Sequence, residues 1–285
     1  MTEEAARTRS EARAVQPQRE RGALDCRGAL LSAAYFIVGF VLIVVVWEAG
    51  ARLGLYPPYL LPAPSTIARR FVDTFGTMVP QMVVTAIEIA IGFVIALVGG
   101  VLMAGLTSFF KFVERALYPW LVITQVIPKI ALGPLFIVWL GFGLLPKVLI
   151  AFLLAFFPIM IGTMIGLRSV ERNSIFLLRT MGAGRMGIFW YVQLPNALPH
   201  LFGSLKVAIT LAAVGAIVGE FIGANNGLGY VLVLSNGTLD TSLMFVSLVW
   251  ISVLALAFYG VVVVAERLLL HWHVSQRGQF GGLNT

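Results

Sequence analysis

Long apolar stretches alternate with short polar ones along this chain. Residues 28–47 contain no charged side chain, and about 20 residues at 1.5 Å per residue in a helix cross a hydrocarbon core of about 30 Å. Five further apolar stretches follow, at residues 82–106, 117–139, 147–167, 201–222 and 243–269. The pattern predicts an all-α membrane protein with six transmembrane helices.

Composition supports this class. The chain has 285 residues, of which 59% are hydrophobic and 12% charged, with a mean hydropathy of +0.93. Soluble domains are typically about half apolar and about a quarter charged. The net charge of +7 is scattered in short groups between apolar stretches, which argues against a nucleic-acid partner. The single Cys26 excludes an internal disulfide and a cysteine metal site.

The basic residues predict the orientation in the membrane. Six arginines precede residue 28, two basic residues lie at 111 and 115, five lie between 168 and 206, and two follow residue 266. These segments share one side of a six-helix protein, so both termini are expected in the cytoplasm. Residues 1–28 carry few large apolar side chains and are expected to form a disordered tail ahead of a transmembrane domain over 29–285. The first apolar stretch is too long for a cleavable signal peptide.

Small residues recur every fourth position on three of the expected helices. They are Gly92, Ala96, Gly100 and Ala104 on the second, Gly162 and Gly166 on the fourth, and Gly215, Gly219 and Gly223 on the fifth. This spacing predicts close helix packing within one subunit, and a dedicated subunit interface is the alternative.

A polar segment at residues 170–200 separates the fourth and fifth expected spans. It mixes Arg172, Arg179 and Arg185 with apolar side chains and contains "GAG" at 182–184 and prolines at 195 and 199. The pattern predicts short amphipathic helices, one of them crosswise under the membrane, whose exposed face docks in a soluble partner. An ordinary basic connecting loop is the alternative.

The stretch "GAGRMGIFWYVQLPNALP" resembles the cytoplasmic EAA loop of ATP-binding cassette (ABC) importer permeases. That loop has EAA, three residues, a Gly, nine residues and Ile-x-Leu-Pro. Gly182, nine residues, and then Val192 to Pro195 fit the spacing, whereas the EAA positions hold Phe176, Leu177 and Leu178. "LLPAPSTI", "PLFIVWLGFGLLPKV", "FFPIMIGTMIGLRSV" and "GLGYVL" are similar to the nitrate, sulfonate and taurine branch. The resemblance covers roughly residues 60–269.

This resemblance implies a type I importer fold with a transverse coupling helix at about 179–191. It implies a complex of two permease subunits with two cytoplasmic ATPases and an external solute-binding protein; a second copy of this chain is the expected partner permease, and a different permease chain is the alternative. The residues implied to couple to the ATPase are Arg179, Gly182, Ala183, Arg185, Leu194 and Pro195. The chain lacks a G-x-x-x-x-G-K-S/T loop, so ATP and Mg²⁺ are expected on the partner, and this chain is not expected to be an enzyme. Glu171 or Arg179 could replace part of the missing EAA contact.

Three charged residues inside the expected spans are candidates for the solute path or its gate. Lys129 lies in the third span beside Pro128, where a charge costs about 2.5 to 3.5 kcal/mol unless it faces protein or water. Lys129 suits an anionic solute, and its alternatives are pairing with Glu88 or Glu220 or reaching towards the interface. Glu220 is expected near an external gate, and Glu88 either at a gate or in a structural pair.

The resulting hypothesis is an inner-membrane importer permease. The branch permits nitrate, bicarbonate, sulfonates, taurine or a small heterocycle as solute. The alternatives are a secondary transporter or channel that uses Lys129 and Glu88 without ATP, and a purely structural membrane protein. No set of catalytic residues is evident, and His271 and His273 are spaced so that they point apart on a helix, so no metal site is expected.

Overall fold

The computed structural model describes residues 19–270, which are helical with short connections and contain no strand. The chain divides into two compact units, residues 1–66 and 67–285, which we describe separately. In the first, α2 (Arg19–Arg52) contains the first expected span. The helix also extends into the segment expected to be a tail, of which residues 1–18 lie outside the described part. Most apolar side chains of α2 between residues 37 and 46 are exposed, as in a helix that contacts lipid.

The prolines between residues 57 and 64 delay the next helix. The helix α3 (Pro64–Asp73) begins with proline at its first position, where the missing N–H costs nothing. The Glu48 carboxylate accepts hydrogen bonds from the Ser65 amide at 3.0 Å and from the Ser65 hydroxyl at 2.7 Å. These bonds satisfy donors at the start of α3.

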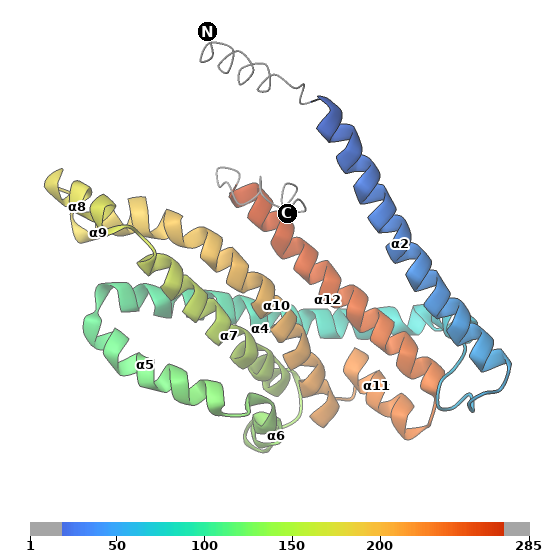
Figure 1. Cartoon of the computed structure of the whole chain (residues 1–285). Helices are drawn as coiled ribbons and strands as arrows, with labels where there is room; N and C mark the ends of the chain where they lie inside the picture. The colour runs from blue at the N-terminus through green and yellow to red at the C-terminus, as the bar shows by residue number, and fades with distance from the viewer. Residues whose placement is uncertain (1–18, 271–285) are drawn as a thin grey trace, which may run out of the picture. The chain divides into compact units, whose positions relative to one another are not determined.

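Three long helices form the core of the second unit. They are α4 (Phe75–Phe109), α7 (Leu144–Arg168) and α10 (Leu194–Gly223), which lie side by side in Figure 1. The helices α11 (Leu228–Gly237) and α12 (Thr241–Leu269) cover one side of α10 and α4. Four helices in the described residues are long and apolar enough to cross a membrane: α4, α7, α12 and the continuous helix Arg185–Gly223.

The expected third span over 117–139 is not one helix, and that prediction is wrong. The structure has α5 (Lys111–Val126), a 3₁₀ turn η1 (Lys129–Leu132) and α6 (Gly133–Leu140) in its place. Pro128 and Pro134 flank the break. Proline removes a backbone donor and restricts the preceding residue to extended angles, and Ile127 is extended at φ −65° and ψ 126°.

Glycine at the helix crossings lets the backbones of α4, α7 and α10 approach closely. A Cβ on Gly92 would lie 2.6 Å from the Ala151 Cβ, and one on Gly215 would lie 2.6 Å from the Ala151 Cα. A Cβ on Gly166 would lie 2.8 Å from the Ala197 Cα. The small-residue repeats therefore pack helices within one subunit, as expected.

We expect Gly215→Val to destabilise the fold strongly, because its side chain would overlap the α7 backbone. The matched control is Gly203→Val on the same helix, where a Cβ has no neighbour within 4 Å. Thermal unfolding of the purified protein in detergent measures the difference. Equal melting temperatures for the two variants would contradict the crossing described here.

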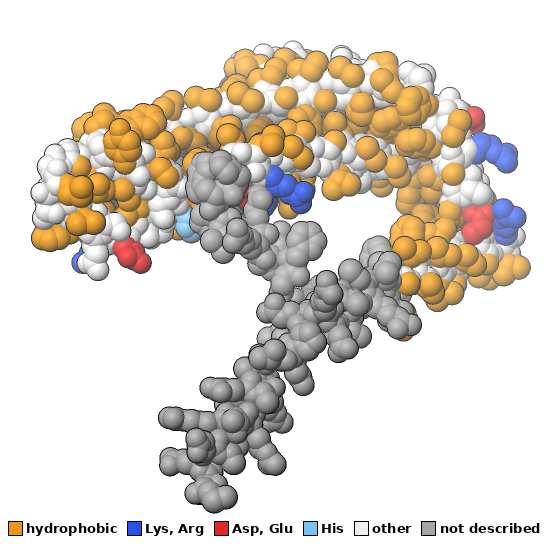
Figure 2. Space-filling model, turned by 90° about the horizontal axis from the view of Figure 1, so that it is seen from above, with side chains coloured by type: hydrophobic (Ala, Val, Ile, Leu, Met, Phe, Trp, Pro, Cys, Tyr) orange, Lys and Arg blue, Asp and Glu red, His pale blue; other side chains and the backbone are white. Residues whose placement is uncertain are grey.

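Hydrophobic side chains also cover most of the face seen in Figure 2. Exposed examples on the helices of the second unit include Val94, Val98 and Leu102 on α4 and Val261 and Val264 on α12. Apolar exposure of this extent marks an interaction surface. On helices of this length the surrounding solvent is lipid.

Candidate functional site

The polar segment between α7 and α10 begins with the amphipathic helix α8 (Arg172–Thr180). Two hydrogen bonds close its end: the Gly182 N–H donates to the Arg179 carbonyl at 3.0 Å, and the Ala183 N–H donates to the Leu178 carbonyl at 2.9 Å. This bonding pattern is a Schellman motif, which needs a left-handed residue after the helix. Gly182 supplies it with φ +86°, so the glycine has a backbone reason to be there.

The helix after this turn runs directly into the membrane span. It starts as α9 (Arg185–Ile188), passes through one π-helical turn η2 (Phe189–Gln193) and continues as α10. The expected single transverse helix at 179–191 is therefore wrong in its boundaries, because Arg179 lies in the last turn of α8 while Arg185 starts a helix continuous with the span. Pro195 lacks an N–H, and the wider π turn just before it accommodates the loss. Gly184 has ordinary extended angles.

Side chains tie this continuous helix to its neighbours. The Ser108 hydroxyl at the end of α4 donates to Gln193 Oε1 at 3.2 Å, and the rings of Phe109 and Phe189 lie 4.8 Å apart. At the end of α7, the Asn196 amide donates to Ser169 Oγ at 2.6 Å. These contacts join η2 to the end of α4 and the start of α10 to the end of α7.

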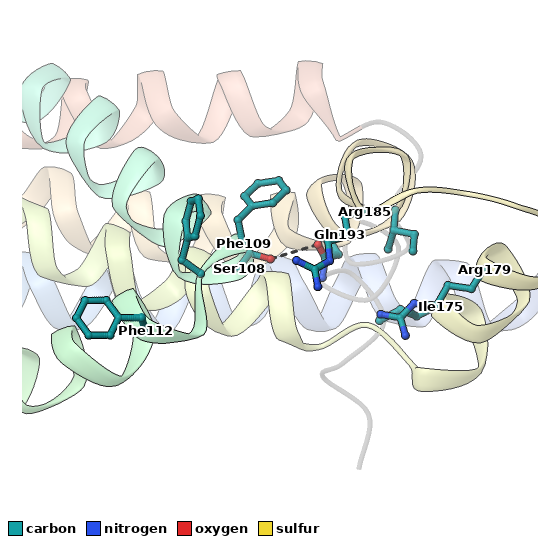
Figure 3. Close-up of a pocket in the computed structure, with 9 residues that line it drawn as sticks. Ser108, Phe109, Phe112, Ile175, Arg179, Arg185 and Gln193 are labelled. Atoms are coloured by element: carbon teal, nitrogen blue, oxygen red, sulfur yellow. Dashed lines mark hydrogen bonds between the residues drawn. The ribbon is translucent and has the colours of Figure 1, made fainter.

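A cavity of about 470 Å³ lies between the end of α4 and the segment that contains α8 and α9. Figure 3 shows Arg179 and Arg185 on one side of it, and Ser108 and Phe109 on the other. Several large apolar side chains of α8, α9 and η2 are exposed: Phe176, Leu177, Met181, Met186, Trp190 and Tyr191. Exposed apolar groups beside two guanidinium groups are typical of a protein-binding surface.

Lys129 lies in a second groove, of about 450 Å³, at the break in the third span. Its ammonium group is 5.0 Å from the centre of the Phe157 ring, a cation–π distance. Gln125 and Ser204 add polar groups to walls that are otherwise mostly apolar and come from α7 and α10. Lys129 is thus half-buried beside an open groove, which meets the requirement that a lysine at this depth faces protein or water.

Glu88 and Glu220 belong to a different cluster, buried among α4, α7 and α10. The Lys147 ammonium donates to Glu88 Oε1 at 2.6 Å, and these two residues are 5% and 0% exposed. Glu220 is a neighbour of this pair, because it bonds Thr85 one turn before Glu88 on α4, and it interacts electrostatically with both Glu88 and Lys147. The alternative in which Lys129 pairs with either glutamate is wrong, since both glutamates interact with Lys147 and Lys129 lies against Phe157. We call Glu88, Lys147 and Glu220 the charged triad.

Glu220 also holds the start of α11. Its carboxylate accepts hydrogen bonds from the Thr85 hydroxyl at 2.6 Å and from the Gly229 N–H at 2.5 Å. The Leu228 N–H donates to Thr85 Oγ1 at 2.9 Å. Gly227 has φ +109°, and a Cβ there would overlap the Glu220 carboxylate. The "GLG" of the "GLGYVL" motif is therefore needed for a close approach of backbone to a buried carboxylate.

Comparison with known proteins decides which kind of membrane protein this is. Residues 96–275 match the family described as "Binding-protein-dependent transport system inner membrane component". The riboflavin transport system permease protein of Chloroflexus aurantiacus is 37% identical to the chain, over 84% of this chain and 90% of that protein. The formylaminopyrimidine transport permease protein of Halalkalibacterium halodurans is 38% identical, over 83% and 95%. A putative aliphatic sulfonates transport permease protein of Bacillus subtilis is 29% identical, over 95% and 96%.

The chain belongs to this family of transport system inner membrane components. It is the permease of an ABC importer and spans the membrane several times. The resemblance to the sulfonate and taurine branch is confirmed, because permeases of that branch are among its relatives. The family is one of membrane permeases and not of enzymes.

The permease structure also contains a site residue that the sequence analysis missed. Lys147 was placed at the edge of the fourth span, yet it is the buried partner of Glu88. The sequence did contain a signal for this partner. Charges on separate apolar helices are costly unless they contact one another, and Glu88, Lys147 and Glu220 lie on three such helices. Arg179, Gly182, Ala183, Arg185, Leu194 and Pro195 do lie on one continuous segment, and their role in coupling stays a prediction.

Proposed function

We propose that the permease carries a small heterocyclic or anionic solute through the groove at Lys129. The observation that supports this most directly is the groove itself, where one ammonium group stands among apolar and aromatic walls beside a break in a helix. Apolar walls with a few polar groups are typical of small-molecule sites. Irregular backbone at membrane depth is tolerated where it lines a cavity.

A planar heterocycle is the solute class that we favour. Two relatives with 37% and 38% identity bear the names of riboflavin and formylaminopyrimidine permeases. Phe157 offers a ring face, and Lys129 offers a donor to a ring nitrogen or carbonyl oxygen. A sulfonate is the second candidate, because a relative is named for sulfonates and because an ammonium group binds such an anion.

We further propose that a separate cytoplasmic ATPase drives transport and that it binds ATP and Mg²⁺. It would dock on the exposed side chains of α8, α9 and η2, with Arg179, Ala183 and Arg185 at the contact. In this arrangement Phe176 and Leu177, which are exposed, replace the acidic contact of the EAA motif with an apolar one. A second copy of the chain and an external solute-binding protein would complete the complex, with both termini in the cytoplasm.

Lys129→Met tests the groove because it removes the charge and keeps a long apolar side chain. We expect uptake to fall about tenfold or more, the effect of losing one hydrogen bond from a charged group. Lys129→Arg keeps the charge and should retain most of the uptake. The measurement is initial uptake of labelled riboflavin, formylaminopyrimidine and taurine by cells that carry the complete transporter. Unchanged uptake in Lys129→Met would remove the groove from the solute path.

A further inference from the structure

The charged triad holds two acids and one base in the interior of the permease. Glu88 is 0% exposed, Glu220 1% and Lys147 5%. If all three were ionised, the cluster would carry a net negative charge among apolar helices. Unbalanced buried charge is costly in a protein interior and more so at membrane depth. One bound proton would remove the imbalance.

The hydrogen bonds indicate that Glu220 is the ionised acid. Both of its oxygens accept: Oε1 from the Thr85 hydroxyl and Oε2 from the Gly229 N–H. The second donor belongs to the first turn of α11, where the helix dipole favours a negative charge. A proton on Glu220 would compete with these donors.

Glu88 has the opposite arrangement. Its Oε1 accepts from the Lys147 ammonium at 2.6 Å, whereas its buried Oε2 has no hydrogen-bond partner. A buried polar atom without a partner needs an explanation. Glu220 bonds Thr85 at 2.6 Å, one turn before Glu88 on α4, so the two carboxyl groups are neighbours, and two buried carboxylates repel each other unless one carries a proton.

We propose that Glu88 is a buried proton-binding site. It holds a proton on Oε2 and donates it in a hydrogen bond to Glu220, while its Oε1 accepts from Lys147. The remaining charges, Lys147 positive and Glu220 negative, balance each other. The hydrogen bond that this proton forms links Glu88 on α4 to Glu220 on α10. Glu220 also accepts a hydrogen bond from the first turn of α11. This inference does not depend on the solute or on the ATPase.

Glutamine variants distinguish the two acids, because a glutamine side chain has the shape of a protonated glutamate. Glu88→Gln keeps an acceptor for Lys147 and a donor for Glu220, so we expect a melting temperature within about 2 °C of the wild type. Glu220→Gln places an NH₂ group against the Thr85 hydroxyl or the Gly229 N–H, so a marked loss of stability is expected. An equal loss in both variants, or a larger loss in Glu88→Gln, would overturn the proposal.

Infrared spectroscopy detects the protonated carboxyl group in the wild-type protein itself, so this test does not depend on whether a variant folds. Purified wild-type permease in detergent should show the carbonyl stretch of a protonated carboxylic acid, shifted in D₂O. The band should be absent from Glu88→Gln and present in the control Glu266→Gln, whose acid lies in a partly exposed ion pair with Lys206. Absence of the band from the wild type would overturn the proposal, whatever the transport assays show.

Discussion

We expect Lys147→Met to lower the free energy of unfolding of the permease by about 3 to 5 kcal/mol. The substitution keeps most of the side-chain volume and removes the positive charge that balances Glu220. Lys147 is buried against Glu88 at 2.6 Å, so its loss removes the direct partner of a buried carboxyl group. Breaking a buried ion pair from one side leaves the other charge without compensation, and this explains the size of the expected effect.

The control for this prediction is Lys206→Met. The Lys206 ammonium pairs with Glu266 at the same distance, 2.6 Å, but the two side chains are 23% and 18% exposed. Partly exposed pairs contribute about 0 to 1 kcal/mol. Thermal unfolding of both variants in one detergent measures the contrast. A Lys147→Met protein as stable as Lys206→Met would show that the triad does not support the fold.

The second large effect is expected at Gly182. Gly182→Asp should abolish transport while the protein still inserts in the membrane. An aspartate there has to adopt the left-handed backbone of the Schellman motif, and it adds a negative charge to a segment whose exposed cations include Arg179 and Arg185. Gly182→Asn is the matched control, because asparagine has nearly the same size, tolerates the left-handed region and adds no charge.

Uptake and membrane abundance are measured together for these two variants. Loss of uptake in Gly182→Asp with normal abundance, and substantial uptake in Gly182→Asn, is the expected result. Loss in both would assign the effect to backbone geometry and not to charge. Full uptake in Gly182→Asp would contradict a coupling role for this turn.

The long helices could be predicted from the sequence because their apolar stretches exceed the membrane thickness. The stretches at 82–106 and 243–269 lie inside α4 and α12. The third span could not be predicted as broken, because hydropathy averages over Pro128 and Pro134 and does not report whether a helix continues through them. The continuity of the helix from Arg185 into α10 could not be predicted either, because a π-helical turn has no distinct amino-acid composition.

The candidate site was predicted unevenly. Gly182 was predicted as a site residue from its spacing to Leu194 and Pro195. Its positive φ explains why a glycine is favoured at that position. Glu88 and Glu220 were recognised as costly charges, but their partner was not. A linear pattern cannot tell which of Lys129 and Lys147 meets them, because that depends on how α4, α7 and α10 pack in three dimensions.

We propose that this permease transports its solute with the energy of ATP hydrolysed by a partner subunit. Uptake by proteoliposomes that contain the permease, its ATPase and its solute-binding protein tests this, measured with and without ATP on the side of the membrane that the ATPase faces. We expect uptake that requires ATP and continues when an ionophore removes ion gradients. Uptake that continues without ATP and stops with the ionophore would contradict it and would identify a secondary transporter.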